Sequence, residues 1–143
     1  MAIPSHLALE IVTPDRAVTH EKVDEVQIPG ADGYFGVLPG HTPLLASLQV
    51  GTLWSRKGRE ITYLSVAFGF AEVLPDRVTI LASIAEKAEE IDVERATAQL
   101  KRAETELSKP SATTSAADLE RARVSLLKAL TRLQVANRAR TRV

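Results

Sequence analysis

The sequence contains no cysteine, which excludes a disulfide framework and a thiolate metal site. It has no charge excess either: 18 basic and 18 acidic residues cancel, so no overall field attracts nucleic acid or an anionic membrane. Its most apolar stretch, Tyr63 to Leu74, is shorter than the roughly 18 residues of a membrane-spanning helix and contains Glu72. We therefore expect no transmembrane segment and no nucleic-acid partner, and we expect charged contacts to be local.

Glycine and aromatic residues are absent from the second part of the chain. All seven glycines lie at or before Gly69, and all six aromatic residues lie at or before Phe70. The remainder is rich in Ala, Leu, Glu, Arg and Lys, which is the composition of helix. We place the junction near Ala85 to Ile91 and expect two domains, residues 1–84 and residues 85–143.

The first domain shows the pattern of short strands. Leu7, Leu9 and Ile11 alternate with more polar neighbours, as in a half-buried strand. Similar strands are expected at Val26 to Ile28, Ile61 to Val66 and Val78 to Leu81, each next to a turn that contains Gly or Pro. Short strands at this spacing, without an intervening helix, predict an antiparallel β-sandwich or barrel.

The second domain shows two helical stripes of apolar residues. Lys109-Pro110 ends the first helix, and Ser115-x-x-Asp118 resembles a capping box that starts the second. The two stripes are Val93, Ala96, Leu100, Ala103, Leu107 and Leu119, Ala122, Leu126, Ala129, Leu133, Ala136. They predict an antiparallel two-helix hairpin. Its many alanines limit the buried apolar area, so we expect the hairpin to be marginally stable by itself.

No catalytic or metal-binding pattern is evident. The glycine run from Gly30 to Gly40 lacks the Gly-Lys-Ser/Thr of a P-loop and suits turns. His6, His20 and His41 are too far apart in sequence to form a metal-binding pair motif. We therefore expect a non-catalytic protein that requires no cofactor and acts by binding other chains.

The second helix is strongly basic. After Glu120 there is no further acid, and the cations are Arg121, Arg123, Lys128, Arg132, Arg138, Arg140 and Arg142. One interpretation is a solvated face with cations near a helix C-terminus, where the helix dipole favours them. The other is a docking surface for an acidic partner, and the sequence pattern leaves both open.

The segment Gly33-Tyr-Phe-Gly-Val-Leu-Pro-Gly-His-Thr-Pro-Leu-Leu45 resembles the signature of the ε subunit of bacterial F-type ATP synthases. Val12-Thr-Pro-Asp15 and Phe68-Gly-Phe-Ala-Glu-Val73 extend this resemblance, as does the order of sandwich and hairpin. The signature positions that it assigns to assembly are Gly33, Gly36, Leu38, Pro39, His41 and Pro43.

The resemblance implies a subunit of the rotating central stalk, peripheral to the cytoplasmic face of the plasma membrane. The sandwich would join the γ subunit to the c-ring, and the extended hairpin would reach the α and β subunits and inhibit ATP hydrolysis. The inhibitory contacts would come from Arg121, Arg123, Lys128 and Arg132. Dispersed cations suit several carboxylates on such a partner.

The resemblance also implies that ATP is a regulatory ligand of the closed hairpin. Ile91-Asp-Val-Glu-Arg-Ala96 is similar to the Ile/Leu-Asp-x-x-Arg-Ala motif of nucleotide-binding relatives. The positions carried over are Glu86, Ile91, Asp92, Arg95, Ala96, Arg102, Lys128 and Arg132. Lys128 stands where such relatives have arginine, so it keeps the charge and loses the planar fork. Asp92 also suits the cap of the first helix, and Arg95 also suits a solvated position.

Two other classes of function stay open at the level of the sequence. A scaffold or adaptor outside an ATPase would use the same sandwich and hairpin. A small ligand-binding or hydrolytic sandwich would need activity in the isolated chain, which the missing catalytic pattern disfavours.

Overall fold

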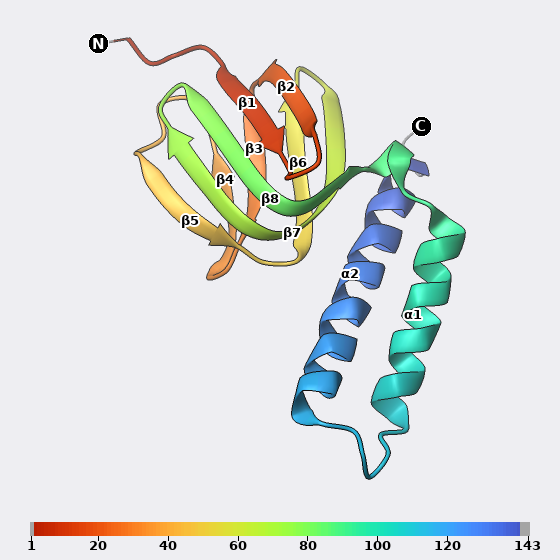
Figure 1. The fold of residues 1–143 in the computed structure, drawn as a ribbon. Coiled ribbons are helices and arrows are strands. Elements are labelled where there is room, and N and C mark those ends of the chain that lie inside the picture. The colour runs from red at the N-terminus through yellow and green to blue at the C-terminus, as the bar shows by residue number, and fades with distance from the viewer. Residues whose placement is uncertain (1, 141–143) are drawn as a thin grey trace. The chain divides into compact units, whose positions relative to one another are not determined.

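The computed structural model describes residues 2–140, and its chain divides between Lys87 and Ala88 into two compact units (Figure 1). The strands of the first unit are β1 (Leu7–Val12), β2 (Ala17–Val23), β3 (Glu25–Gly30), β4 (Gly33–Val37), β5 (Leu44–Leu48), β6 (Gly51–Lys57), β7 (Glu60–Leu74) and β8 (Arg77–Lys87). The second unit contains the short 3-10 helix η1 (Ala88–Glu90) and the helices α1 (Val93–Ser108) and α2 (Ala116–Arg140). The predicted fold class, a β-sandwich followed by two helices, is confirmed.

The core of the sandwich unit is aliphatic. Leu7, Leu9 and Ile11 of β1 are fully buried and alternate with half-buried neighbours, as the sequence pattern predicts. They pack in one cluster with side chains from both layers, among them Ile28, Leu53, Leu64, Val66, Val73 and Ile80. All members of this cluster lie between Leu7 and Ala85, so the sandwich unit has a hydrophobic core of its own.

Strand β7 connects the two layers of the sandwich. Its first part, Glu60 to Val66, pairs with β6, and its second part, Gly69 to Val73, pairs with β5. The change of partner falls at Phe68 and Gly69, which both have positive φ values of 57° and 116°. Strands that pass from one layer to the other bend at such positions.

Gly69 is required at this kink. A Cβ atom at Gly69 would lie 1.9 Å from the backbone oxygen of Leu81 on β8, and backbone cannot move aside cheaply. The kink also places Phe68 and Phe70 at exposed positions on either side of Gly69.

One strand pair is parallel. β1 pairs with β8 in parallel register, from Ala8 opposite Arg77 to Val12 opposite Leu81, whereas the other pairings in the described sheet are antiparallel. These are the first and last strands of the sandwich. Their pairing brings the start of the unit beside the strand that leads to the hairpin.

The glycine run forms turns, as the sequence analysis predicted. Gly30 pairs with Gly33 at the end of the β3–β4 hairpin, and a Cβ at Gly30 would lie 2.8 Å from the Gly33 oxygen. Gly40 has a φ of 87° in the loop before β5, and its amide donates to the Pro75 oxygen at 2.7 Å. This bond anchors the β4–β5 loop to the β7–β8 turn.

The two helices begin where the capping residues predict. Asp92 is the N-cap of α1 and accepts a hydrogen bond from the Arg95 amide at 3.1 Å. At the start of α2, the Asp118 amide donates to Ser115 Oγ, and the Ser115 amide donates to Asp118 Oδ2. These reciprocal bonds form the predicted capping box.

Alanines form the centre of the contact between α1 and α2. The buried alanines are Ala96 and Ala103 on α1 and Ala122, Ala129 and Ala136 on α2. The leucines of the predicted stripes lie at the margins of this seam and are only half-buried. Small side chains let helix backbones approach closely, so side chains beside the seam can reach across it.

We predict that Gly69→Ala destabilises the sandwich by about 3 kcal/mol or more, because the new Cβ meets backbone in a left-handed conformation. Gly58→Ala is the matched control, since Gly58 has a φ of 62° with open space around it and should cost about 1 to 2 kcal/mol. The measurement is urea unfolding of the full chain followed by fluorescence of Trp54, the single tryptophan, which lies on β6. Equal losses in the two variants would contradict the steric explanation.

Candidate functional site

Each helix of the hairpin carries a polar stripe beside the alanine seam. On α1 the stripe is Arg95, Gln99, Arg102 and Glu106, and on α2 it is Arg121, Ser125, Lys128 and Arg132. Both sets have successive spacings of four, three and four, which keeps side chains on one face of a helix. Each stripe therefore projects along one side of its helix.

Gln99 joins the two stripes. Its Nε2 donates to Ser125 Oγ at 3.1 Å, and its Oε1 accepts from Arg132 Nη1 at 3.4 Å. Both partners are on α2, so the bonds place the two stripes on the same side of the hairpin. We call the eight residues of these stripes the cationic flank, since five of the eight are Arg or Lys and only Glu106 is acidic.

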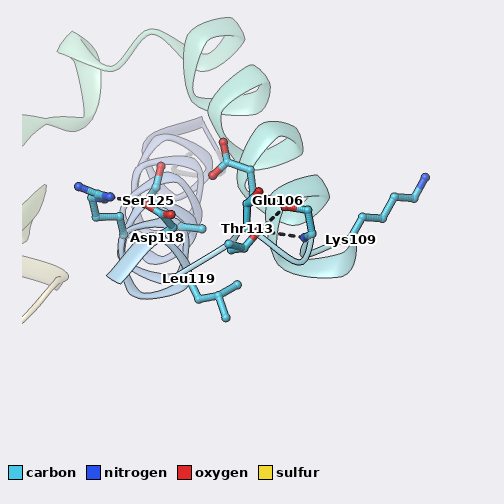
Figure 2. Close-up of a pocket in the computed structure, with 10 residues that line it drawn as sticks. Glu106, Lys109, Thr113, Asp118, Leu119 and Ser125 are labelled. Atoms are coloured by element: carbon cyan, nitrogen blue, oxygen red, sulfur yellow. Dashed lines mark hydrogen bonds and ion pairs between the residues drawn. The ribbon is translucent and has the colours of Figure 1, made fainter. Parts of the chain in front are cut away.

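A cleft of about 580 Å³ lies at the tip of the hairpin (Figure 2). It is lined by residues of both stripes, Glu106 from α1 and Arg121 and Ser125 from α2, which is a second indication that the stripes share one side. Hydroxyl groups of the α1–α2 loop complete its wall, and Lys109 extends outward from it in Figure 2.

Two arginines of α2 have partners on their own helix. Arg121 pairs with Asp118, and Arg123 pairs with Glu120 at 2.6 Å. Hydrogen bonds from the Ser115 amide and from Arg121 hold the pKa of Asp118 below its ordinary value of 3.8. The hydrogen bond from Arg123 likewise lowers the pKa of Glu120. These exposed pairs contribute little stability, so the arginines can exchange partners at small cost.

The four residues expected to contact α and β do not share one face. Arg121, Lys128 and Arg132 belong to the cationic flank, whereas Arg123 lies on the other side of the seam by its helical position. Arg138 is exposed near the end of α2. The side chain of Arg140 and the whole of Arg142 lie outside the described residues.

The residues expected to bind ATP divide into three groups. Arg95, Arg102, Lys128 and Arg132 lie on the cationic flank. Asp92 caps α1, and Ile91 and Ala96 are buried beside it. Glu86 lies on β8 of the sandwich unit, opposite Ser65 of β7. The structure thus brings the four cations of the set to one side of the hairpin.

The signature residues lie on β4 and in the loop that follows it. Gly33 and Gly36 are on β4, while Leu38, Pro39, His41 and Pro43 form the loop between β4 and β5. The His41 amide donates to the Leu38 oxygen at 3.1 Å, which tightens this loop. Three leucines of this segment, Leu38, Leu44 and Leu45, are exposed, and Leu45 retains 71% of its accessible surface.

A second apolar surface crosses strands of the sandwich. Phe70 of β7 lies opposite Leu81 of β8, and Leu81 lies opposite Val12 of β1. Directly opposite residues share one face of a sheet, so these three form a continuous row. Phe70 and Leu81 are 55% and 54% exposed, and they line a shallow cleft with Thr13 and Pro14.

Sequence reasoning missed Gln99, Ser125 and the row Val12–Leu81–Phe70. The row depends on pairing between strands far apart in sequence, so no local pattern could reveal it. The helical stripes were detectable, because Arg95, Gln99 and Arg102 repeat at helical spacing. The polar stripe was not predicted, because only the apolar positions of each helix were interpreted as a stripe.

Within residues 2–140, no group of three or more His, Asp or Glu side chains could hold a metal ion. No helix of the described part of the chain is long and apolar enough to span a membrane.

Comparison with protein families gives two matches that follow the two units. The model of the ATP synthase delta/epsilon chain β-sandwich domain matches residues 6–88. That of the delta/epsilon chain long α-helix domain matches residues 89–137.

Curated relatives cover most of the chain. It is 50% identical to the ATP synthase epsilon chain of Solibacter usitatus (strain Ellin6076) over 109 residues, which are 76% of this chain and 81% of the relative. It is 47% identical to ATP synthase epsilon chain 2 of Syntrophotalea carbinolica over 132 residues, 92% of this chain and 94% of the relative.

Solved structures share the fold. A chain in the cryo-EM structure of the Euglena gracilis mitochondrial ATP synthase, OSCP/F1/c-ring in rotational state 1, has a TM-score of 0.80 at 24% identity. The match covers 98% of this chain and 84% of that chain.

Fold and surfaces together define a β-sandwich with exposed apolar surface, joined to a helical hairpin with a cationic flank. The chain belongs to the family of ATP synthase delta/epsilon chains, and its bacterial relatives are ATP synthase epsilon chains.

Proposed function

We propose that the chain is a non-catalytic central-stalk subunit of an F-type ATP synthase, in which the sandwich joins γ to the c-ring and the hairpin restrains ATP hydrolysis. The observation that carries the proposal is that the two units expose surfaces of different chemistry. Apolar residues are exposed on the sandwich, and cations line the hairpin. The subunit would be peripheral to the cytoplasmic face of the bacterial plasma membrane.

The sandwich suits permanent assembly. Phe70, Leu81 and Leu45 are large side chains that remain more than half exposed in the isolated chain. Burying one such side chain against a partner contributes about 1.5 to 3 kcal/mol, and this contribution is insensitive to salt. We assign the row Val12–Leu81–Phe70 to γ and the signature loop Leu38–Pro43 to the c-ring.

We predict that a chain ending at Lys87 assembles with γ and supports proton-driven ATP synthesis, because it keeps the whole core and the complete β7–β8 pairing. Within this chain, Phe70→Asp with Leu81→Asp should abolish co-purification with γ. Lys57→Asp, at the end of β6, is the charge-changing control and should leave it intact. Normal assembly of the Phe70/Leu81 variant would exclude this row as the γ contact.

The hairpin suits a reversible contact. Its flank presents five cations from two helices, and exposed cations attract carboxylates without requiring a buried ion pair. Such contacts weaken with salt, because screening acts over about 8 Å at physiological ionic strength. Extension of the hairpin along γ would bring α2 to acidic surfaces of α and β and impede rotation in the hydrolysis direction.

We predict that replacing Arg121, Arg123, Lys128 and Arg132 by Ala raises ATP hydrolysis by the assembled complex, because the extended hairpin loses its electrostatic contacts. The wild-type rate should approach that of the variant as salt increases. The single variant Arg123→Ala tests the side of α2 that lies away from the flank, since Arg123 is not a flank residue. Unchanged hydrolysis in a normally assembled quadruple variant would contradict the contact.

ATP is the second ligand that the flank suits. Arg95 and Arg102 from α1 and Lys128 and Arg132 from α2 lie on one side of the closed hairpin, so one phosphate chain can contact both helices. A ligand at about 100 times its Kd stabilises the form that binds it by about 2.7 kcal/mol. That stabilisation is large enough to control a hairpin whose seam is mostly alanine.

We predict that Arg95→Ala and Arg132→Ala each weaken ATP binding to the full chain by about tenfold or more, as expected for lost charge-assisted bonds. Arg123→Ala is the matched control and should keep the wild-type Kd. Isothermal titration calorimetry of the isolated chain gives these values. Absence of binding at millimolar ATP would reject the site, and unchanged binding in both test variants would reject these residues as its ligands.

A further inference from the structure

Gln99 bonds to two other flank residues across the hairpin. Arg132 can only donate hydrogen bonds, so the Gln99 oxygen must face it, and the amide group must then face Ser125 Oγ. The two bonds fix the carboxamide in one orientation. Gln99 is half-buried, whereas Arg95 and Arg102 on either side of it are exposed.

We propose that Gln99 is a positioning residue for nucleotide binding: it holds the Arg132 guanidinium against the closed hairpin in the orientation that receives phosphate. This inference rests on the proposed ATP site of the flank. The Gln99 oxygen accepts its bond from Nη1 of Arg132. Because the guanidinium is planar, a bond at Nη1 sets the direction in which the rest of the group points.

The bond also couples Arg132 to closure. Gln99 is on α1 and both its partners are on α2, so the carboxamide can orient Arg132 only while the helices are packed together. An oriented guanidinium loses less conformational entropy when phosphate binds. Gln99 therefore makes the closed hairpin a better receptor for phosphate than the separated helices.

The variants separate orientation from charge. Gln99→Leu removes both bonds and keeps a side chain of similar size, so it should weaken ATP binding by about fivefold, the size of a typical net hydrogen-bond contribution. Gln99→Glu keeps an acceptor for Arg132 and adds a negative charge to the flank, so it should weaken binding by at least about tenfold. Gln134→Leu, on an exposed part of α2 off the flank, is the matched control and should bind as wild type.

The decisive measurement is a double-mutant cycle by titration calorimetry with ATP on the full chain. If Gln99 acts through Arg132, Gln99→Leu should change the Kd by less than about twofold when Arg132 is already Ala. A role only in hairpin stability would give the fivefold loss in both backgrounds and would overturn the proposal.

A ligand-free measurement completes the test. In the nuclear magnetic resonance spectrum of the full chain without ATP, Gln99→Leu should shift the Arg132 Nε–Hε resonance and leave that of Arg95 in place. An unshifted Arg132 resonance would overturn the positioning contact itself. ATP binding by the wild type with an unchanged Kd in Gln99→Leu would reject Gln99 alone, whereas no binding by the wild type would reject the ATP site on which it depends.

Discussion

The close contact between α1 and α2 is the constraint on which the hairpin's chemistry depends. Ala96 and Ala103 of α1 and Ala122 and Ala129 of α2 are all buried in the seam, and side chains this small let the two helices approach closely. Only then can Gln99 reach two residues of the other helix. Larger seam residues would move the helices apart and separate the two halves of the cationic flank. The same alanines bury little area, so proximity is obtained with limited stability.

Limited stability is what makes the hairpin suitable for regulation. A ligand changes a conformational equilibrium only by its difference in affinity for the two forms, and about 1 to 3 kcal/mol is a typical range. A seam of leucines would hold the hairpin closed against such a difference. The sandwich shows the opposite design, because its aliphatic core is continuous and its kink at Gly69 tolerates no larger residue. The surface proposed for permanent assembly and the one proposed for reversible contact therefore lie on units of different internal packing.

The sequence predicted what depends on near neighbours. The β1 alternation, the Asp92 cap, the Ser115–Asp118 capping box and the helical stripes all follow from residues a few positions apart, and all are present. The parallel pairing of β1 with β8 joins segments more than 60 residues apart, and the partner change of β7 requires two layers to be in place. Of the candidate site, the cations were predictable by type and position. The Gln99 bridge that places them on one side was not, because the register of two helices is set by packing.

The proposed ligands of the flank compete for the same cations. Lys128 and Arg132 belong both to the set assigned to ATP and to the set assigned to α and β, while Arg95 and Arg102 belong only to the first. When phosphate binds Lys128 and Arg132, these side chains are no longer available to the carboxylates of a partner. When carboxylates bind them instead, two of the four cations proposed to bind phosphate are occupied. The two equilibria are linked. If ATP lowers the affinity for the acidic partner by some factor, docking of that partner must lower the affinity for ATP by the same factor. Under the proposed function, the α1 cations take part only when the helices are packed, so ATP would favour the closed hairpin, whereas α2 alone would suffice for an acidic partner. Two such ligands sharing one helix would therefore have opposite preferences for hairpin closure without a separate regulatory site.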